Sequence, residues 1–452
     1  MATWEQNRLG DLVETQKGYA FKSGWYSDAG RPIVKVSDFT TDSVDSSSLV
    51  CIPEEIAADY LKYELKIGDV VVQTVGSWPT NPASVVGKCV RIPSNAAGAL
   101  LNQNAVKLSP TKALDAQFLF YLLRSDDFKT YIIGTAQGAA SQAAITLEAI
   151  RGYEFAAPPL PVQRRIAGIL SAYDELMENS QRRIRLLEAM SRALYREWFV
   201  HFRFPGHEKH PRVASPLGDI PQGWEATTLG AHLAALESGK RPKGGIREEA
   251  EGVPSIGAEN INGIGRHEFA SEKLVPREFF EQMRKGVVRD RDVAIYKDGA
   301  YIGKSSYFRD GFPHSECCVN EHVFLLRANG VRLKQNALYI WLQEPDTVQT
   351  IRSKNANAAQ PGINQQTVGG LELILPDENT AAHFDRLVEP LLAEIINLAK
   401  RIQNLRRTRD LLLPRLLSGQ AALPHSASPS GRGAELDVSR GIQQTSGAVQ
   451  PA

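Results

Sequence analysis

The sequence predicts an α+β fold in which two similar mixed α/β domains are each followed by a long helix, and the two helices form an antiparallel coiled coil with pseudo-two-fold symmetry. Three observations support this prediction. The chain has 452 residues, which is too long for one ordinary core and suits two domains of about 150–180 residues with additional helix. Its two halves repeat each other. Each half also ends in a long heptad pattern.

The internal repeat keeps a nearly constant register. Trp4-Glu5 and Leu9-Gly10 return as Trp224-Glu225 and Leu229-Gly230, with the same spacing between the two pairs. Later positions correspond at almost the same separation along the chain, namely Gln142 and Gln360, Ile145 and Ile363, Ile184 and Ile402, and Leu187 and Leu405. A register kept over this length indicates duplication of one globular domain plus one helix.

Changes in residue pattern predict the boundaries in the first half. In residues 1–160, β-branched runs such as Val70–Val72 alternate with Gly, Pro, Asn and Ser, which is typical of a strand-rich domain, and a short helix is expected near 116–123. Prolines at 158, 159 and 161 mark its end. A long helix is predicted over 161–200, followed by a linker over 201–220 that Pro211, Pro216 and Pro221 keep extended.

The second half repeats this order. A second domain is predicted over 221–377, with a strand at Val293–Tyr296 and a short helix at 338–342. A second long helix is predicted over 378–418, with a kink or restart at Pro390. Residues 419–452 are rich in Ala, Ser, Gly, Pro and Gln, a composition typical of a disordered tail.

The two long helices carry apolar stripes of matching length and phase. A helix of about 38 residues spans about 57 Å, which is longer than one domain needs. Each stripe could pack on its own domain, but the matching phase favours packing of the helices on each other, as a strut that sets the distance between the domains. The predicted seam consists of Ile166, Leu170, Met177, Ile184, Leu187, Leu194 and Trp198 in the first helix and Leu391, Ile395, Leu398, Ile402, Leu405, Leu412 and Leu416 in the second.

Composition limits the class of protein. Hydrophobic residues make up 42% of the chain and charged residues 23%, which is typical of a globular protein, and the net charge of +1 neither requires nor excludes a nucleic-acid partner. The four cysteines lack metal-ligand spacing, which suits a reducing compartment. No apolar run approaches about 18 residues and the N-terminus has no apolar signal core, so we expect a cytoplasmic protein outside the membrane.

No catalytic constellation is evident in the sequence. The segment Gly299–Ser305 resembles a phosphate-binding loop, but Asp298 occupies the position where that loop requires glycine. His201, His207 and His210 lie in the proline-rich linker without the pattern of a metal site. No nucleophile elbow or adenine-methyltransferase motif is found. We therefore expect a binding protein that is not an enzyme and holds no metal or cofactor of its own.

Polar side chains that can read base edges occur at equivalent positions in both halves. Asn and Gln can bind adenine in a bidentate manner, and cations can neutralise phosphates. Such clusters are also ordinary turn residues, so single positions carry less weight than their recurrence. The candidate DNA-binding residues are Lys17, Lys22, Lys35, Lys88, Asn102, Gln103, Asn104, Gln137, Ser141 and Gln142 in the first half, and Lys240, Arg241, Lys243, Arg266, Lys297, Lys304, Asn320, His322, Asn355, Asn357 and Gln360 in the second.

Taken together, these features resemble the specificity subunit of a type I restriction-modification enzyme. The resemblance rests on the paired Trp-Glu…Leu-Gly starts, on Gln142–Ile145 with its twin Gln360–Ile363, and on the stretches 161–170 and 198–206, and it covers about residues 1–418. The family often opens its long helix with a Glu-Gln pair. Here Val162-Gln163 stands in the first copy, and the second copy lacks the pair.

The resemblance implies a function as well as a fold. The two domains would be target recognition domains that each read one half of a bipartite double-stranded DNA site, and the paired helices would set the spacer. Two modification subunits would bring S-adenosylmethionine and methylate adenine, and two restriction subunits would use ATP and Mg²⁺. The alternatives from other classes are a coiled-coil protein-interaction scaffold without sequence-specific DNA binding, and an enzyme with an unrecognised active site.

Overall fold

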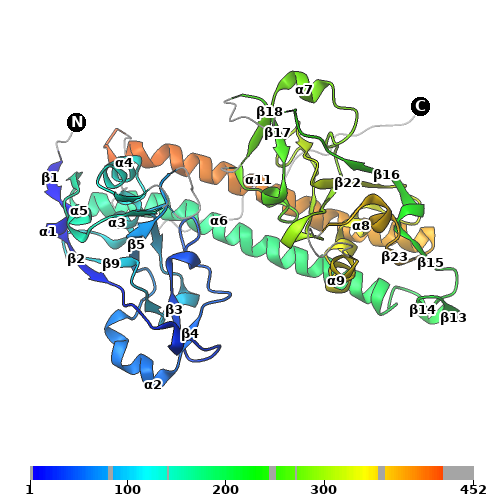
Figure 1. The fold of residues 1–452 in the computed structure, drawn as a ribbon, viewed down its shortest axis with the longest axis horizontal. Helices are drawn as coiled ribbons and strands as arrows, with labels where there is room; N and C mark the ends of the chain where they lie inside the picture. The colour runs from blue at the N-terminus through cyan, green and yellow to red at the C-terminus, as the bar shows by residue number, and fades with distance from the viewer. Residues whose placement is uncertain are drawn as a thin grey trace, which may run out of the picture.

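A computed structural model describes residues 4–79, 85–139, 142–243, 251–269, 272–354 and 362–420. Two mixed units of helix and strand lie at opposite ends of a pair of long helices, α6 (Leu160–Tyr195) and α11 (Glu378–Leu417), which run side by side (Figure 1). The predicted fold class is therefore confirmed. The expected tail from 421 onward lies outside the described residues.

The first domain is built around a four-stranded antiparallel sheet of strand order β2-β9-β5-β7. A smaller sheet, β4-β3-β8, contains the parallel pair β3 and β8, and β1 pairs with β12 where the chain enters and leaves the domain. The elements are β1 (Glu5–Arg8), α1 (Leu9–Leu12), β2 (Val13–Lys17), β3 (Arg31–Val34), β4 (Cys51–Ile52), α2 (Glu54–Ala57), β5 (Val70–Gln73), β6 (Val75–Gly76), β7 (Cys89–Arg91), β8 (Leu100–Leu101), β9 (Ala105–Pro110), α3 (Ala116–Leu122), α4 (Asp126–Gly134), β10 (Gln137–Ala139), β11 (Gln142–Ala144), α5 (Leu147–Arg151) and β12 (Glu154–Ala157).

The second domain repeats the topology of these three sheets. Its central sheet has the order β16-β22-β19-β20, its smaller sheet β18-β17-β21 again contains one parallel pair, and β15 pairs with β23. The elements are β15 (Glu225–Thr228), β16 (Leu233–Ser238), β17 (Val253–Ile256), β18 (Lys273–Val275), α7 (Arg277–Glu281), β19 (Val293–Tyr296), β20 (Ser305–Tyr307), β21 (Cys318–Val319), β22 (Val323–Ala328), α8 (Gln335–Leu342), α9 (Pro345–Ser353), α10 (Gln365–Gly369) and β23 (Glu372–Leu375).

Both faces of each central sheet are buried. Val70 and Val72 on β5 face the core that contains the long helices, whereas Val71 faces a separate core on the other side. Successive side chains of a strand point to opposite faces, so a strand covered on both sides is apolar throughout. This explains the uninterrupted valine run. The equivalent strand β19 divides Val293 and Ile295 from Ala294 in the same way.

The long helices pack on each other and on both domains. Ile166 and Leu170 near the start of α6 belong to the first domain's core, and Leu416 near the end of α11 joins them there. At the other end, Trp198 and Phe384 share the second domain's core. Packing on a domain and packing on the partner helix are thus not alternatives. Burial of each such side chain contributes about 1.5–3 kcal/mol. These apolar contacts therefore supply most of the energy that holds the long helices to the domains.

Contacts between the helices establish that they are antiparallel. Asp174 pairs with Arg409 at 2.5 Å, Arg183 with Glu394 at 2.7 Å, and the Trp198 ring lies 5.6 Å from that of Phe384. The partner on α11 moves toward lower residue numbers as the chain advances along α6. This is the arrangement expected of two helices related by a pseudo-two-fold axis.

The predicted seam residues are all wholly or partly buried. Leu392, which was not in the predicted seam, is buried, whereas its neighbour Leu391 is only partly buried. The fully buried members are Ile166, Leu170, Met177, Ile184, Trp198, Ile395, Leu398 and Leu416, and the partly buried ones are Leu187, Leu194, Leu391, Ile402, Leu405 and Leu412.

Two expectations differ from the structure. α11 does not restart at Pro390 but continues as one helix past that proline, and the buried Val388 and Leu392 hold the helix against the core on either side. The linker over 201–220 also folds. After a π-helical turn, η6 (Arg196–Val200), and a 3₁₀ turn, η7 (His207–Lys209), it forms the hairpin β13 (Arg212–Ser215) and β14 (Gly218–Pro221). The rings of Phe202 and Phe204 anchor it on Trp224.

Candidate nucleic-acid interface

Three polar segments meet at one edge of the first domain. Thr74 follows the central strand β5, and its N–H donates to the carbonyl of Asn104 at 2.8 Å. Its own carbonyl accepts from the N–H of Ile145 at 2.9 Å, which anchors the end of the polar loop. The N–H of Gln73 donates to Lys88 O at 2.9 Å, so the turn that carries Lys88 lies beside them. The backbone of a central strand thus gathers segments that are far apart in the sequence.

The second domain builds the same edge with the same hydrogen bonds. Lys297 takes the place of Thr74, and its N–H donates to His322 O at 3.0 Å. Its carbonyl accepts from the N–H of Ile363 at 2.9 Å, and the N–H of Tyr296 donates to Lys304 O at 2.8 Å. The backbone frame of the repeat is therefore kept while the side chains on it differ.

Two equivalent glycines bring a further lysine to each edge. A Cβ at Gly18 would lie 1.9 Å from the carbonyl oxygen of Asn102, and one at Gly239 would lie 1.7 Å from that of Val319. Only glycine permits so close an approach of two backbones. The neighbouring Lys17 and Lys240 are consequently exposed beside the polar turn of each domain.

We call these two sets of residues the polar edges. Gln137 and Gln142 are exposed on β10 and β11. These two strands pair with each other, and β11 also pairs with β6, which directly follows β5. The first polar edge comprises Lys17, Lys88, Asn102, Gln103, Asn104, Gln137 and Gln142, and the second comprises Lys240, Lys297, Lys304, Asn320 and His322. The structure thus brings together most of the predicted residues that it describes.

Two predicted residues serve the turns themselves. Asn102 and Asn320 are each only 8% exposed. Their Oδ1 atoms accept backbone N–H groups, from Gln103 at 2.8 Å and from His322 at 2.9 Å. An asparagine side chain that closes its own turn in this way has a scaffolding role. Base contacts are better suited to the exposed neighbours than to these two amides.

Three basic side chains at or beside the second polar edge already have partners. His322 Nδ1 lies 2.6 Å from Asp298, and Arg241 lies 3.0 Å from Glu321. The ammonium of Lys304 lies 4.2 Å from the centre of the exposed Tyr301 ring. Because these pairs reach solvent, a stronger charge such as a phosphate can compete for the cations at small cost. Lys240 and Lys243 are exposed.

Other predicted residues lie elsewhere. Lys22 and Lys35 stack over Trp25 and Tyr26, at 5.3 and 5.7 Å from the ring centres. Arg266 forms an ion pair at 2.5 Å with Glu188 of α6, a contact that ties the second domain to the helix pair. Burial raises the pKa of Glu188, although Arg266 opposes that shift. Ser141, Asn355, Asn357 and Gln360 lie outside the described residues.

Sequence reasoning missed the side chains that join the helices to the domains. Gln163, at the start of α6, is 2% exposed. Its Oε1 accepts from the N–H of Asp115 at 2.8 Å, and its Nε2 donates to Ala113 O at 3.1 Å and to Pro158 O at 2.9 Å. One side chain therefore ties α6 to the start of α3 and to the end of β12. In the sequence, Gln163 was marked by its place just after a proline cluster and by the pair Val162-Gln163, but neither signal revealed these contacts.

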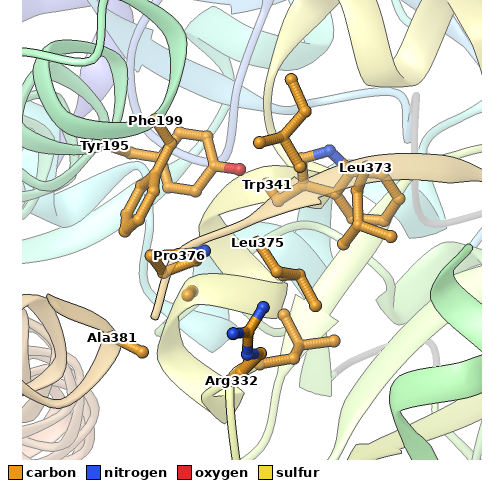
Figure 2. Close-up of a pocket in the computed structure, with 11 residues that line it drawn as sticks. Tyr195, Phe199, Arg332, Trp341, Leu373, Leu375, Pro376 and Ala381 are labelled. Carbon is orange, nitrogen blue, oxygen red and sulfur yellow. The ribbon is translucent and has the colours of Figure 1, made fainter. Parts of the chain in front are cut away.

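The second domain has a pocket at the equivalent place. Ala381 is the repeat equivalent of Gln163 and carries only a methyl group. A pocket of about 310 Å³, including its open mouth, is lined there by Ala381, Pro376 and Arg332, among other residues. Pro376 and Arg332 are the repeat equivalents of Pro158 and Ala113, which Gln163 contacts. Figure 2 shows the rings of Tyr195, Phe199 and Trp341 around this space.

The second junction relies on charge instead. Glu389 of α11 accepts from Arg291 at 2.6 Å, from Arg309 at 2.8 Å and from Asn336 at 2.8 Å. Burial opposes ionisation of Glu389, but the three hydrogen bonds outweigh it and lower the pKa of the carboxyl to about 2. Asp385 lies one turn earlier and also accepts from Asn336, and burial raises its pKa.

The first domain has a smaller network of the same kind. Asp174 of α6 accepts from the Tyr121 hydroxyl at 2.5 Å and from Arg409 of α11 at 2.5 Å. Arg409 is 4% exposed, so this guanidinium is a buried cation inside the apolar seam. Its occurrence in the seam is explained by the carboxylate that faces it.

Comparison with known proteins agrees with this architecture. Residues 1–189 match the family model of the type I restriction modification DNA specificity domain. The MjaIX specificity subunit of Methanocaldococcus jannaschii is 22% identical over 320 residues, which are 71% of this chain and 72% of that protein. The MjaX subunit from the same organism is described as putative and is 25% identical over 65% of this chain and 66% of its own length.

Residues 1–189 therefore belong to the type I restriction modification DNA specificity domain family. The crystal structure of the type I system S subunit from M. genitalium shares the fold, with a TM-score of 0.51 at 15% identity over 91% of this chain and 96% of that one. Specificity subunits are the non-catalytic members of their complexes, which agrees with the expectation that this chain is not itself an enzyme. Within the described residues, no helix has the length and apolar character needed to cross a membrane.

Proposed function

We propose that this specificity subunit binds a bipartite double-stranded DNA target, with one half-site read by each polar edge. The observation that carries the proposal is the repetition of one backbone frame with different polar side chains on each copy. Two readers of the same build that carry different side chains would select two different base sequences. The α6 and α11 pair would set the spacing, since helices of 36 and 40 residues span about 54 and 60 Å.

We further propose that the chain supplies sequence choice to partner subunits that supply chemistry. Modification subunits would bring S-adenosylmethionine and methylate adenine, and restriction subunits would use ATP and Mg²⁺ to act on unmodified DNA. The proposed assembly contains two of each. Support comes from family membership and from the two-fold character of the helix pair, which would present similar surfaces at its two ends.

The test maps base preference separately in the two half-sites. Methylated adenines are first located in cells that carry this chain and its modification subunits, to obtain the target. The purified complex is then titrated with targets mutated in either half. The Gln142→Ala change at the first polar edge should relax selectivity in one half-site by about 1–3 kcal/mol. The Lys240→Ala change should weaken binding to all sequences. It should also reduce the slope of log binding constant against log salt concentration by about one.

The Gln181→Ala change on the exposed face of α6 is the matched control and should leave binding unchanged. Equal relaxation of both half-sites by Gln142→Ala would contradict the assignment of one half-site to each domain. Binding without any base preference would instead favour a protein-interaction scaffold. Gln360 and Asn357, which lie outside the described residues, should behave like Gln142 for the other half-site.

A further inference from the structure

Two loops of the second domain meet at a cluster of two histidines and a glutamate. His267 and Glu272 lie on the segment that leads into β18, and His314 lies between β20 and β21. One ligand atom from each residue lies within 4.8 Å of the other two. Both ring Nε2 atoms contact the same oxygen, Oε1 of Glu272. Two segments that are far apart in the sequence thus direct three ligand atoms at one point.

The cluster is enclosed on one side and open on the other. The His267 side chain is 1% exposed, that of Glu272 17% and that of His314 25%. The Phe269 ring packs against both imidazoles, with ring centres 4.6 Å from His267 and 5.7 Å from His314. The two imidazole planes are inclined at 87° to each other. Apolar packing therefore holds the rings in place, while Glu272 and His314 remain partly exposed to solvent.

We propose that this cluster binds one Zn²⁺ ion through His267 Nε2, His314 Nε2 and the Glu272 carboxylate. Two imidazole nitrogens and one carboxylate are an established ligand set for zinc, and water commonly fills the fourth position. Because the ligands lie on two different loops, the ion would link them. Among the residues that the structure describes, no other group of three or more such side chains converges in this way.

The linked segment supports the helix pair. A Cβ at Gly265, two residues before His267, would lie 3.1 Å from side-chain atoms of Ile395 and Ala399 on α11. The intervening Arg266 pairs with Glu188 on α6. A metal ion at His267 would therefore rigidify the segment that docks on both long helices. The first domain, residues 1–160, contains no histidine, so the site belongs to one copy only.

The test measures zinc binding by the full chain directly. The protein is stripped with a chelator and titrated with Zn²⁺ against a chromophoric competitor, and the stripped protein is also loaded with Co²⁺ for its visible absorption. We expect one tight site per chain. The His314→Ala and Glu272→Gln changes should each weaken it at least about 100-fold, because loss even of an outer-sphere partner costs about 10–100-fold. Glu272→Gln keeps an oxygen that can accept the imidazole N–H bonds, so it separates metal binding from a hydrogen-bonded triad.

The control is the double change His207→Ala and His210→Ala, which removes two histidines from the segment before β13 and should leave zinc affinity unchanged. Circular dichroism verifies that each variant is folded. A wild-type chain that takes up no tight zinc overturns the proposal, as does one whose affinity survives Glu272→Gln and His314→Ala. The readout is independent of DNA binding, so failure here leaves the proposed reading of DNA untouched.

Discussion

The two junctions between domain and helix occupy equivalent places in the repeat and use different chemistry. At the first, the buried Gln163 holds the start of α6 with three hydrogen bonds to backbone groups. At the second, Ala381 occupies the equivalent position beside an apolar pocket. There the helix is held farther along by Glu389. A duplicated fold can therefore keep its architecture while the polar contacts that hold it move to other positions.

The difference has a physical origin. A neutral amide satisfies buried backbone groups without bringing a charge out of water, whereas a carboxylate must be matched by cations. In the second domain Arg291 and Arg309 supply that match. Arg309 is 2% exposed, so each partner depends on the other. The second junction should therefore be more sensitive to pH than the first.

The largest expected effect is at Glu389. The Glu389→Ala change leaves the buried Arg309 with only the more exposed carboxylate of Asp310, and we expect a loss of about 3 kcal/mol in the free energy of unfolding. Urea denaturation of the full chain measures it. The control is Glu394→Ala, which removes the exposed pair with Arg183 and should cost less than about 1 kcal/mol. Equal losses in the two variants would show that the buried network is not what holds α11.

The next effect is at the first junction. The Gln163→Ala change strands the N–H of Asp115 and the carbonyls of Ala113 and Pro158, and we expect a loss of about 2 kcal/mol. The same denaturation experiment applies, with the exposed Gln181→Ala on the same helix as its control. If Gln163→Ala leaves the free energy of unfolding unchanged, the hydrogen bonds of Gln163 do not stabilise the first junction.

The pH dependence sharpens the comparison. The pKa of Glu389 in the folded chain is about 2, below its ordinary value of 4.5. A lowered pKa means that the stabilisation is present above about pH 4.5 and is lost as the pH falls toward 2. The slope of unfolding free energy against pH in this window should be shallower in Glu389→Gln than in the wild type. The Gln163→Ala variant should keep the wild-type slope. A shallower slope in that variant would show that the pH dependence does not arise at the second junction alone.

The smallest effect should be a gain. The Ala381→Gln change places in the second junction the side chain that the first one uses, and the pocket beside it has room. We expect stabilisation of about 0.5–1 kcal/mol, as is common when a pocket is filled. An increase in melting temperature measures it, and Ala382→Gln on the neighbouring position is the control. A lower melting temperature would indicate that the second junction has lost the backbone geometry that receives a glutamine.

Much of the architecture was visible in residue patterns. The heptad stripes marked both long helices, and the valine run marked β5, because periodic burial leaves a periodic sequence. The polar edges were only partly foreseen. The pattern of Asn and Gln did not reveal that Asn102 and Asn320 close their own turns, or that Arg266 belongs to an ion pair with Glu188. Arg266 and Glu188 lie far apart in the chain, so no local pattern encodes their pairing. The turns that Asn102 and Asn320 close are local, but asparagine is typical both of turns and of base contacts, so residue type alone does not separate the two roles.

Repetition and periodicity are properties of the chain alone, so residue order was enough to establish a duplicated unit with two amphipathic helices and with different polar loops on its two copies. Folding in three dimensions settled how α11 passes Pro390 unbroken, why Arg409 can sit in an apolar seam, and where His267, Glu272 and His314 meet. Each of these depends on the energy of contacts between distant segments, which exist only after the chain has folded.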